Sequence, residues 1–123
     1  MTIEEATNNR LQVEYYSKLR WCGIGEELKN LADNCGFSFR ISGFPNPNGS
    51  PKYGFIGSGY ALFGPGALEV RVHVQQNDLI RVEFREHTTI VSSHLITQID
   101  EVDKIQEMVW NWFRSRLHWG RTL

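Results

Sequence analysis

The sequence has few of the features that assign a protein to a class at sight. Its only cysteines, Cys22 and Cys35, form no CxxC pair, which argues against a disulfide framework or a cysteine-rich zinc site. No apolar run approaches the roughly 20 residues of a membrane-spanning helix. The polar Met1–Glu5 segment lacks the basic and apolar regions of a secretory signal. These absences predict a cytoplasmic protein that does not bind membranes.

An excess of charge of either sign is also missing. The 123 residues include 13 Lys and Arg against 14 Asp and Glu, a net charge of −1, so no global field attracts the chain to nucleic acid or to an acidic surface. With 41% hydrophobic and 22% charged residues, the chain has enough apolar side chains to fold around a core of its own. Its length suits a single domain, residues 1–123.

The N-terminal third predicts two helices. Apolar residues recur at helical spacing as far as Cys22, and Gly23 then interrupts the pattern. A second apolar stripe covers residues 24–35, and Gly36 follows it as a left-handed residue that ends a helix. Because Cys22 and Cys35 both lie on these stripes, we expect their thiols to be buried and unreactive.

Five strands are predicted after residue 36, where the apolar pattern changes to a period of two. Short local connections favour an antiparallel meander. The predicted class is therefore α+β, with two N-terminal helices, a sheet of about five strands and a long C-terminal helix packed on the sheet. The strands are residues 37–41, 53–63 with an interruption at 57–59, 68–74, 80–84, and 88–99 with an irregularity at Ser92 and Ser93.

The hairpin of residues 68–74 and 80–84 has a register that follows from its apolar residues. Placing the apolar side chains of both strands on one face brings opposite charges together on the other face, which supports the register independently. The predicted pairs are Val72 with Val82, Val74 with Ile80, Arg71 with Glu83 and Glu69 with Arg85.

The last predicted helix begins at Asp100 as N-cap and runs to about His118. Its core stripe follows from the helical angle of about 100° per residue. Trp112 and Trp119 widen the stripe on one flank and Trp110 on the other, so the apolar arc covers well over half of the helix. The residues of the core stripe are Val102, Ile105, Val109, Phe113 and Leu117.

This wide arc leaves three interpretations open. In the first, the aromatic rings fill the edges of a small core and the stem of Arg116 runs over them to solvent. In the second, the arc is an interface with another protein or a second copy, since Trp, Met and Arg are enriched in interface cores. In the third, Arg114, Arg116 and Arg121 bind phosphates of a nucleic acid whose bases stack on the rings.

A second candidate surface is the loop region that contains Phe44 and Tyr53. Loops held on a rigid sheet often bind partners, although ordinary turns with buried aromatic rings account for this pattern better. The partner-binding residues predicted from the two surfaces are Trp110, Trp112, Arg114, Arg116, Trp119, Arg121, Phe44 and Tyr53.

No arrangement typical of catalysis or of metal binding is present in the sequence. The Gly54–Gly59 stretch lacks the Lys-Ser/Thr of a P-loop, and a strand follows it where a phosphate loop needs a helix. His73 is predicted opposite Arg81, and His87 and His94 lack the spacing of a typical zinc pair. We therefore expect no catalytic residue, no metal and no cofactor.

The sequence favours a non-catalytic protein-binding module, such as an adaptor, an immunity protein or an inhibitor from a virus or mobile element, that also forms a homodimer. Its contact surface would combine the last helix with the sheet loops. The first alternative is a small-ligand-binding protein or an enzyme with a cleft between the sheet and the last helix, where Arg116 meets an anion. The second alternative is nucleic-acid binding by the basic, aromatic C-terminus.

Overall fold

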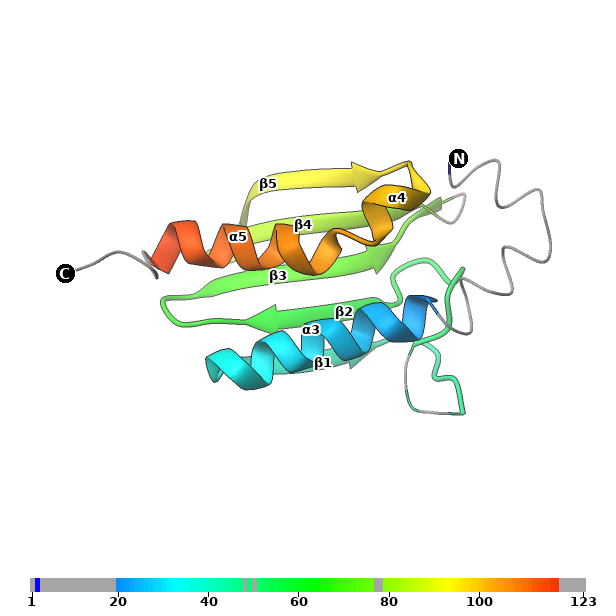
Figure 1. Cartoon of the computed structure of the whole chain (residues 1–123), viewed down its shortest axis with the longest axis horizontal. Coiled ribbons are helices and arrows are strands. Elements are labelled where there is room, and N and C mark those ends of the chain that lie inside the picture. Colours follow the sequence, from blue (N-terminus) through cyan, green and yellow to red (C-terminus); the bar gives the residue numbers. More distant parts are fainter. Residues whose placement is uncertain (1, 3–19, 48, 50, 77–78, 118–123) are drawn as a thin grey trace.

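The computed structural model describes residues 2, 20–47, 49, 51–76 and 79–117. The described part contains helices and one antiparallel sheet (Figure 1), so the predicted α+β class is confirmed. The elements are α3 (Trp21–Cys35), β1 (Ser38–Ser42), β2 (Gly59–Phe63), β3 (Leu68–Val74), β4 (Ile80–Glu86), β5 (Thr89–Ile96), α4 (Ile99–Val102) and α5 (Ile105–Leu117).

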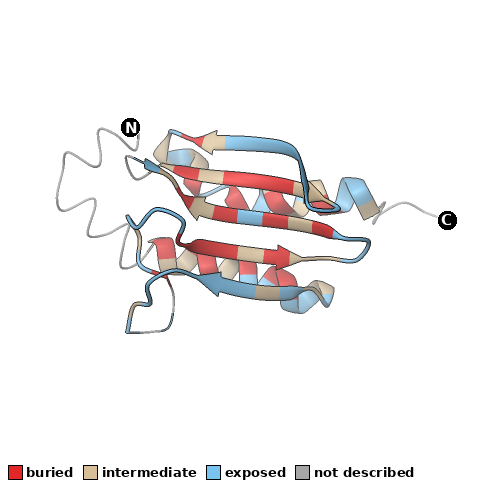
Figure 2. Cartoon of the chain, turned by 180° about the vertical axis from the view of Figure 1, so that it is seen from behind, coloured by how far each residue is buried: buried red, intermediate tan, exposed pale blue. Residues whose placement is uncertain are grey.

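The sheet is a five-stranded meander in the order β1-β2-β3-β4-β5, and each strand runs antiparallel to its neighbours. Helices α3 and α5 lie side by side on one face, α3 over the β1–β2 side and α5 over the β3–β4 side (Figure 1). Seen from behind, the sheet lies in front of both helices and no described element covers it (Figure 2). We call this second surface the open face.

The predicted register of the central hairpin is confirmed. All four pairs form between β3 and β4 as expected from the sequence. The apolar members of these pairs are fully buried beneath the helices, while the charged members lie on the open face. Alternation with a period of two thus separates the core from the charged surface.

The expected break at Gly23 is wrong, because α3 continues through this residue to Cys35. A glycine inside a helix costs about 1 kcal/mol, but Trp21, Ile24 and Leu28 are buried on either side of it, and that burial outweighs the cost. The predicted end at Gly36 is confirmed, with a left-handed φ of 73°. Most of the first predicted helix lies outside the described residues, so the described part has one N-terminal helix where two were expected.

The expected single C-terminal helix is also corrected, because the chain forms a short α4 and then α5. The N-cap is Gln98 where Asp100 was expected, and Gln98 forms a reciprocal capping box with Glu101. Arg20 stabilises the break between the two helices, since its guanidinium contacts the Asp103 carboxylate at 2.6 Å and donates to the Val102 carbonyl at 3.4 Å.

Of the five described strands, β3 has its predicted bounds, β1, β4 and β5 differ by up to three residues at an end, and β2 differs most. Residues 53–58 form turns, which the buried Ser58 stabilises by donating its hydroxyl to the Lys52 carbonyl at 2.9 Å, so β2 begins at Gly59. The irregularity expected at Ser92 and Ser93 lies just before them, where the β4–β5 register shifts between Phe84 and Arg85.

The core between the sheet and α5 is filled. Ile105, Val109 and Phe113 are each 0% exposed, as the core stripe predicted. The largest fully buried side chain, Trp21 on α3, was not singled out in the sequence. The interior is thus occupied by α5 residues of the stripe itself, and Trp110 and Trp112 on its flanks are half-buried at the edges.

Candidate functional site

The two described tryptophans of α5 have different surroundings, and both are half-buried. The Trp112 ring packs 5.0 Å from the Phe84 ring and 5.2 Å from the Phe113 ring. Its indole nitrogen is buried and has no hydrogen-bond partner within the described residues. Trp112 therefore extends the core at one flank of α5.

Arg116 and Arg114 lie at the C-terminal end of α5. The Arg116 Nε is 3.4 Å from a carboxylate oxygen of Glu86, and its guanidinium lies 5.7 Å from the centre of the Trp112 ring. Arg114 is exposed and donates to the Asn111 side chain at 3.5 Å. Trp119 and Arg121, also predicted as contact residues, lie outside the described residues.

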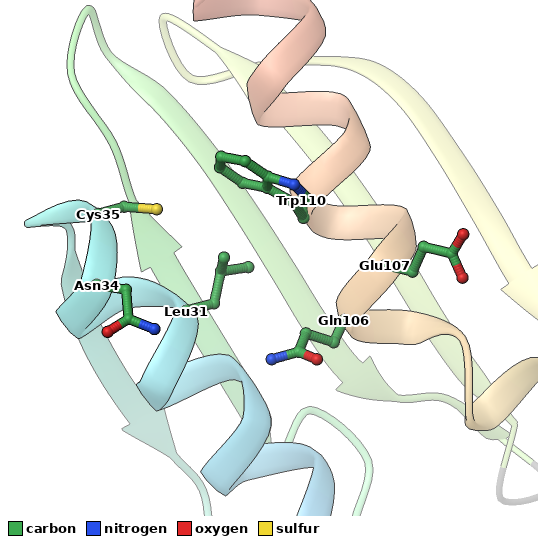
Figure 3. Close-up of a pocket in the computed structure, with 6 residues that line it drawn as sticks. All are labelled: Leu31, Asn34, Cys35, Gln106, Glu107 and Trp110. Carbon is green, nitrogen blue, oxygen red and sulfur yellow. The ribbon is translucent and has the colours of Figure 1, made fainter. Parts of the chain in front are cut away.

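Trp110 lies on the other flank of α5 and faces α3 across a surface groove (Figure 3). The groove has a volume of about 820 Å³. It opens between the two helices, beside α5, whereas the sequence suggested a cleft beneath it. We call it the inter-helix groove. Its lining residues are Leu31, Asn34 and Cys35 from α3 and Gln106, Glu107 and Trp110 from α5.

The floor of the groove is apolar and its rim is polar. Leu31 is 9% exposed and Cys35 is half-buried. Burial raises the pKa of the Cys35 thiol, so this group stays protonated and uncharged near neutral pH. Asn34 and Glu107 are exposed at the edges. A hollow of this composition favours an apolar group with a few polar contacts around it.

A hydrogen bond between the helices closes one end of the groove. The Gln106 amide nitrogen donates to the main-chain carbonyl of Glu27 at 2.9 Å. Near the start of α3, Arg20 contacts Glu27 at 3.1 Å and Asp103 at 2.6 Å. These contacts connect α3 to the α4–α5 segment, so the groove has walls of fixed spacing.

The helical layer around the groove is acidic. The described helical segments, residues 20–36 and 98–117, carry seven Asp and Glu against five Lys and Arg. Glu107 is the acidic residue that lines the groove itself. The field at the groove therefore favours a ligand with positive charge next to its apolar groups.

The two residues predicted for the loop surface have separate environments. Phe44 is 60% exposed, and its ring lies 4.8 Å from the Phe55 ring. Tyr53 is half-buried, with its ring 5.5 Å from that of the buried Trp21. Phe44 therefore belongs to an exposed aromatic patch, and Tyr53 belongs to the edge of the core.

Sequence reasoning missed five of the six groove residues, Trp110 being the exception. Leu31 and Cys35 were assigned to the apolar stripe of their helix, and Cys35 was expected to be buried, whereas both cysteines are half-buried. The spacing of apolar residues does not show which two helices of a layer become neighbours. Nothing in the sequence around the polar rim residues Asn34, Gln106 and Glu107 distinguishes them from other polar helix residues.

The described residues contain no group of three or more His, Cys, Asp or Glu side chains placed to hold a metal ion. No described helix is long and apolar enough to cross a membrane. We compared the chain with models of known protein families, with curated proteins and with solved structures, and nothing matches it in any of the three comparisons.

Proposed function

We propose that the protein is a non-catalytic protein-binding module and that its partner docks in the inter-helix groove. One observation carries the proposal: an apolar hollow of about 820 Å³ lies at the surface with Trp110 on its wall. Its size is in the range of ligand-binding pockets, about 300–1,000 Å³. Tryptophan is among the side chains that contribute most to protein interfaces once a partner removes the remaining water from the ring.

The partner that fits is an amphipathic helix with a basic border. A groove between two helices accepts the apolar face of a third helix, a frequent mode of peptide recognition. The helical layer carries more acidic than basic residues, and Glu107 is exposed at the groove. Lys or Arg beside the apolar residues of the partner would therefore match the charge of this surface.

An adaptor, immunity protein or inhibitor would act through such a surface without any chemical step. The exposed Phe44 patch is the second contact that we retain from the sequence, placed on a loop beyond β1. A homodimer is the other arrangement compatible with the groove, and the experiment below distinguishes it from a foreign helix.

The test is affinity selection of displayed helical peptides on the full chain, followed by fluorescence anisotropy of the selected peptides. We expect peptides with apolar residues three or four positions apart and with adjacent Lys or Arg. Trp110→Ala should weaken binding at least about 30-fold, the equivalent of about 2 kcal/mol. Glu107→Lys should weaken binding of the basic peptides, because it reverses the charge at the groove.

Two matched variants serve as controls. Glu26→Lys makes the same charge reversal on α3 at an exposed position outside the groove, and it should leave affinity unchanged. Phe44→Ala removes an exposed ring from the loop patch. If Phe44→Ala abolishes binding while Trp110→Ala and Glu107→Lys bind normally, the groove is not the contact surface. A dimer in sedimentation that Trp110→Ala dissociates would replace the foreign helix with a second copy.

A further inference from the structure

The open face carries polar side chains in rows that cross all five strands. One row contains Arg40, Ala61, Arg71, Glu83 and Ser93, because each is the register partner of the next. The adjacent row contains Ser42, Gly59, His73, Arg81 and Leu95. In both rows the β2 residue has the smallest side chain, so the surface is low between β1 and β3.

A hollow of about 410 Å³ lies at this low point. Ala61 of β2 contributes to its floor, Arg40 and Ser42 line it from β1, and Arg71 and His73 line it from β3. Glu83 and Arg85, which form an ion pair with each other, line it from β4. β1 and β3 are two strand spacings apart, roughly 10 Å. An oxyanion placed between them can accept hydrogen bonds from arginine side chains on both sides.

Gly59 of β2 lies between Ser42 and His73, next to this floor. A Cβ atom added here would lie 2.1 Å from the Val72 carbonyl oxygen and 2.7 Å from the His73 Cα. Both are backbone atoms of the neighbouring strand, which cannot move aside. A side chain at position 59 is therefore excluded, and the hollow between Ser42 and His73 stays open.

Positive charge is in excess on the open face. Its strand residues include four arginines and two glutamates, Arg40, Arg71, Arg81, Arg85, Glu69 and Glu83. Glu83 contacts Arg85 at 2.5 Å, and Glu69 contacts Arg71 at 2.7 Å and Arg85 at 3.6 Å. The carboxylates of Glu69 and Glu83 are therefore both paired with arginines of β3 and β4.

Two guanidinium groups beside the hollow keep donors available. Within the described residues, Arg40 has no carboxylate partner, and its guanidinium lies 5.2 Å from the centre of the Phe63 ring. Arg71 is bound to Glu69 through Nε, which leaves both of its Nη groups for another acceptor. Both side chains are exposed and line the hollow.

We propose that this hollow binds the phosphate group of a small phosphate monoester, held between Arg40 of β1 and Arg71 of β3. A phosphate dianion neutralises two positive charges, which equals the excess of arginine over glutamate on the open face. The planar guanidinium fork matches the geometry of phosphate oxygens. The site lies on the sheet surface opposite the helices (Figure 2), so it is separate from the inter-helix groove.

His73 shapes the hollow without adding charge near neutral pH. The Gln75 amide donates to His73 Nδ1 at 2.9 Å, which leaves the proton on Nε2, 3.4 Å from Glu83. Burial lowers the pKa of His73, with Arg81 and Arg71 acting in the same direction and Glu83 opposing them. The positive charge offered to a ligand therefore comes from the arginines.

Isothermal titration of the full chain at pH 7.5 tests the proposal. The titrants are inorganic phosphate and adenosine monophosphate, with sodium chloride at matched ionic strength as the non-specific control. Arg40→Gln and Arg71→Gln should each weaken phosphate binding at least about tenfold, since a hydrogen bond to a charged group is lost. Ala61→Leu should do the same by filling the floor, without any change of charge.

Lys104→Gln is the matched control, because it removes an exposed positive charge from the segment between α4 and α5, on the opposite side of the sheet. It should leave phosphate affinity unchanged. Tighter binding of adenosine monophosphate than of inorganic phosphate identifies an ester as the ligand, and the reverse identifies free phosphate. Equal affinity in all variants, or an equal response to chloride, overturns the proposal. So does far tighter binding of decathymidylate, which would make the open face a nucleic-acid surface.

Discussion

The Tyr60 hydroxyl on β2 donates a hydrogen bond of 2.8 Å to the main-chain carbonyl of Trp21 at the start of α3. Their rings are 4.9 Å apart, and both side chains are buried. This contact joins the helical layer to the sheet across 39 residues of sequence. Burial raises the pKa of Tyr60 far above its ordinary value, so the hydroxyl remains protonated and keeps donating.

The same Tyr60 ring makes Gly25 the critical glycine of α3. A Cβ at position 25 would lie 2.5 Å from the ring, whereas one at Gly23 would meet only the end of the Arg20 side chain at 3.3 Å. We predict that Gly25→Ala destabilises the fold by about 1–3 kcal/mol through overpacking. Gly23→Ala should be neutral or stabilise by up to about 1 kcal/mol. Urea unfolding measures both, and equal effects of the two variants would contradict this account of the contact.

A strained turn between β4 and β5 predicts a stabilising substitution. His87 and Thr88 have φ values of 51° and 67°, as in a two-residue type I′ turn, which favours Asn-Gly. Thr88 is β-branched, so the left-handed conformation is costly for it. Thr88→Gly should raise the free energy of unfolding by about 1 kcal/mol. Thr89→Gly, one residue later in β5, should lower it, and a loss of stability in Thr88→Gly would refute the assigned strain.

Acid should destabilise the charged pairs of the open face in two steps. The pKa of His73 is lowered by burial, against the opposing effect of Glu83. As the pH falls, His73 is therefore protonated in the unfolded chain at a higher pH than in the folded protein. Burial alone would raise the pKa of Glu83, but the hydrogen bond and charge of Arg85, together with His73, bring it below its ordinary value. Both shifts make stability fall with falling pH, first below about 6.5 and then below about 4.5.

Unfolding free energies between pH 8 and pH 3 measure these steps. Each group contributes at most about 1.4 kcal/mol per pH unit within its window. His73→Gln should remove the decline that starts near pH 6.5. Glu83→Gln should reduce the one that starts near pH 4.5, and a part should remain because the hydrogen bond of His94 also lowers the pKa of Glu101. A decline below pH 6.5 that persists in His73→Gln would show that another group causes it.

The sheet was the most predictable part of the fold, for a local reason. The alternation of apolar residues determines which face of β3 and β4 is buried. A shift of the strand register by one residue would move all of these apolar side chains to the exposed face. The register partners Arg71 with Glu83 and Glu69 with Arg85 follow from that pattern, although the ion pair of Arg71 is with Glu69 of its own strand. The turn of β4 into β5 was missed because His87 and Thr88 lack the Asn-Gly signal of a type I′ turn.

Helix ends were less predictable because distant contacts decide them. Arg20 stabilises the break between α4 and α5 from the start of α3, and nothing near Asp103 in the sequence indicates such a partner. Gly23 lies inside α3 because burial of neighbouring residues outweighs its low helix propensity.

The candidate groove could be predicted only in part. The width of the apolar arc singled out Trp110, because that residue lies off the core stripe of α5. Trp112, assigned to the same class, packs on Phe84 and so extends the core. The α3 side of the groove depends on which helix becomes the neighbour of α5, and that follows from the topology of the whole sheet.

The most direct test of the groove as the contact surface is the accessibility of Cys35, which lines it. The chain has two cysteines, so the Cys22→Ser variant keeps Cys35 alone. Its rate of alkylation by a maleimide can be measured with and without a saturating concentration of a selected peptide. We predict at least about tenfold protection by the bound peptide, and none when Trp110→Ala abolishes binding. An alkylation rate of Cys35 that stays unchanged while the peptide is fully bound would place the contact surface elsewhere on the molecule.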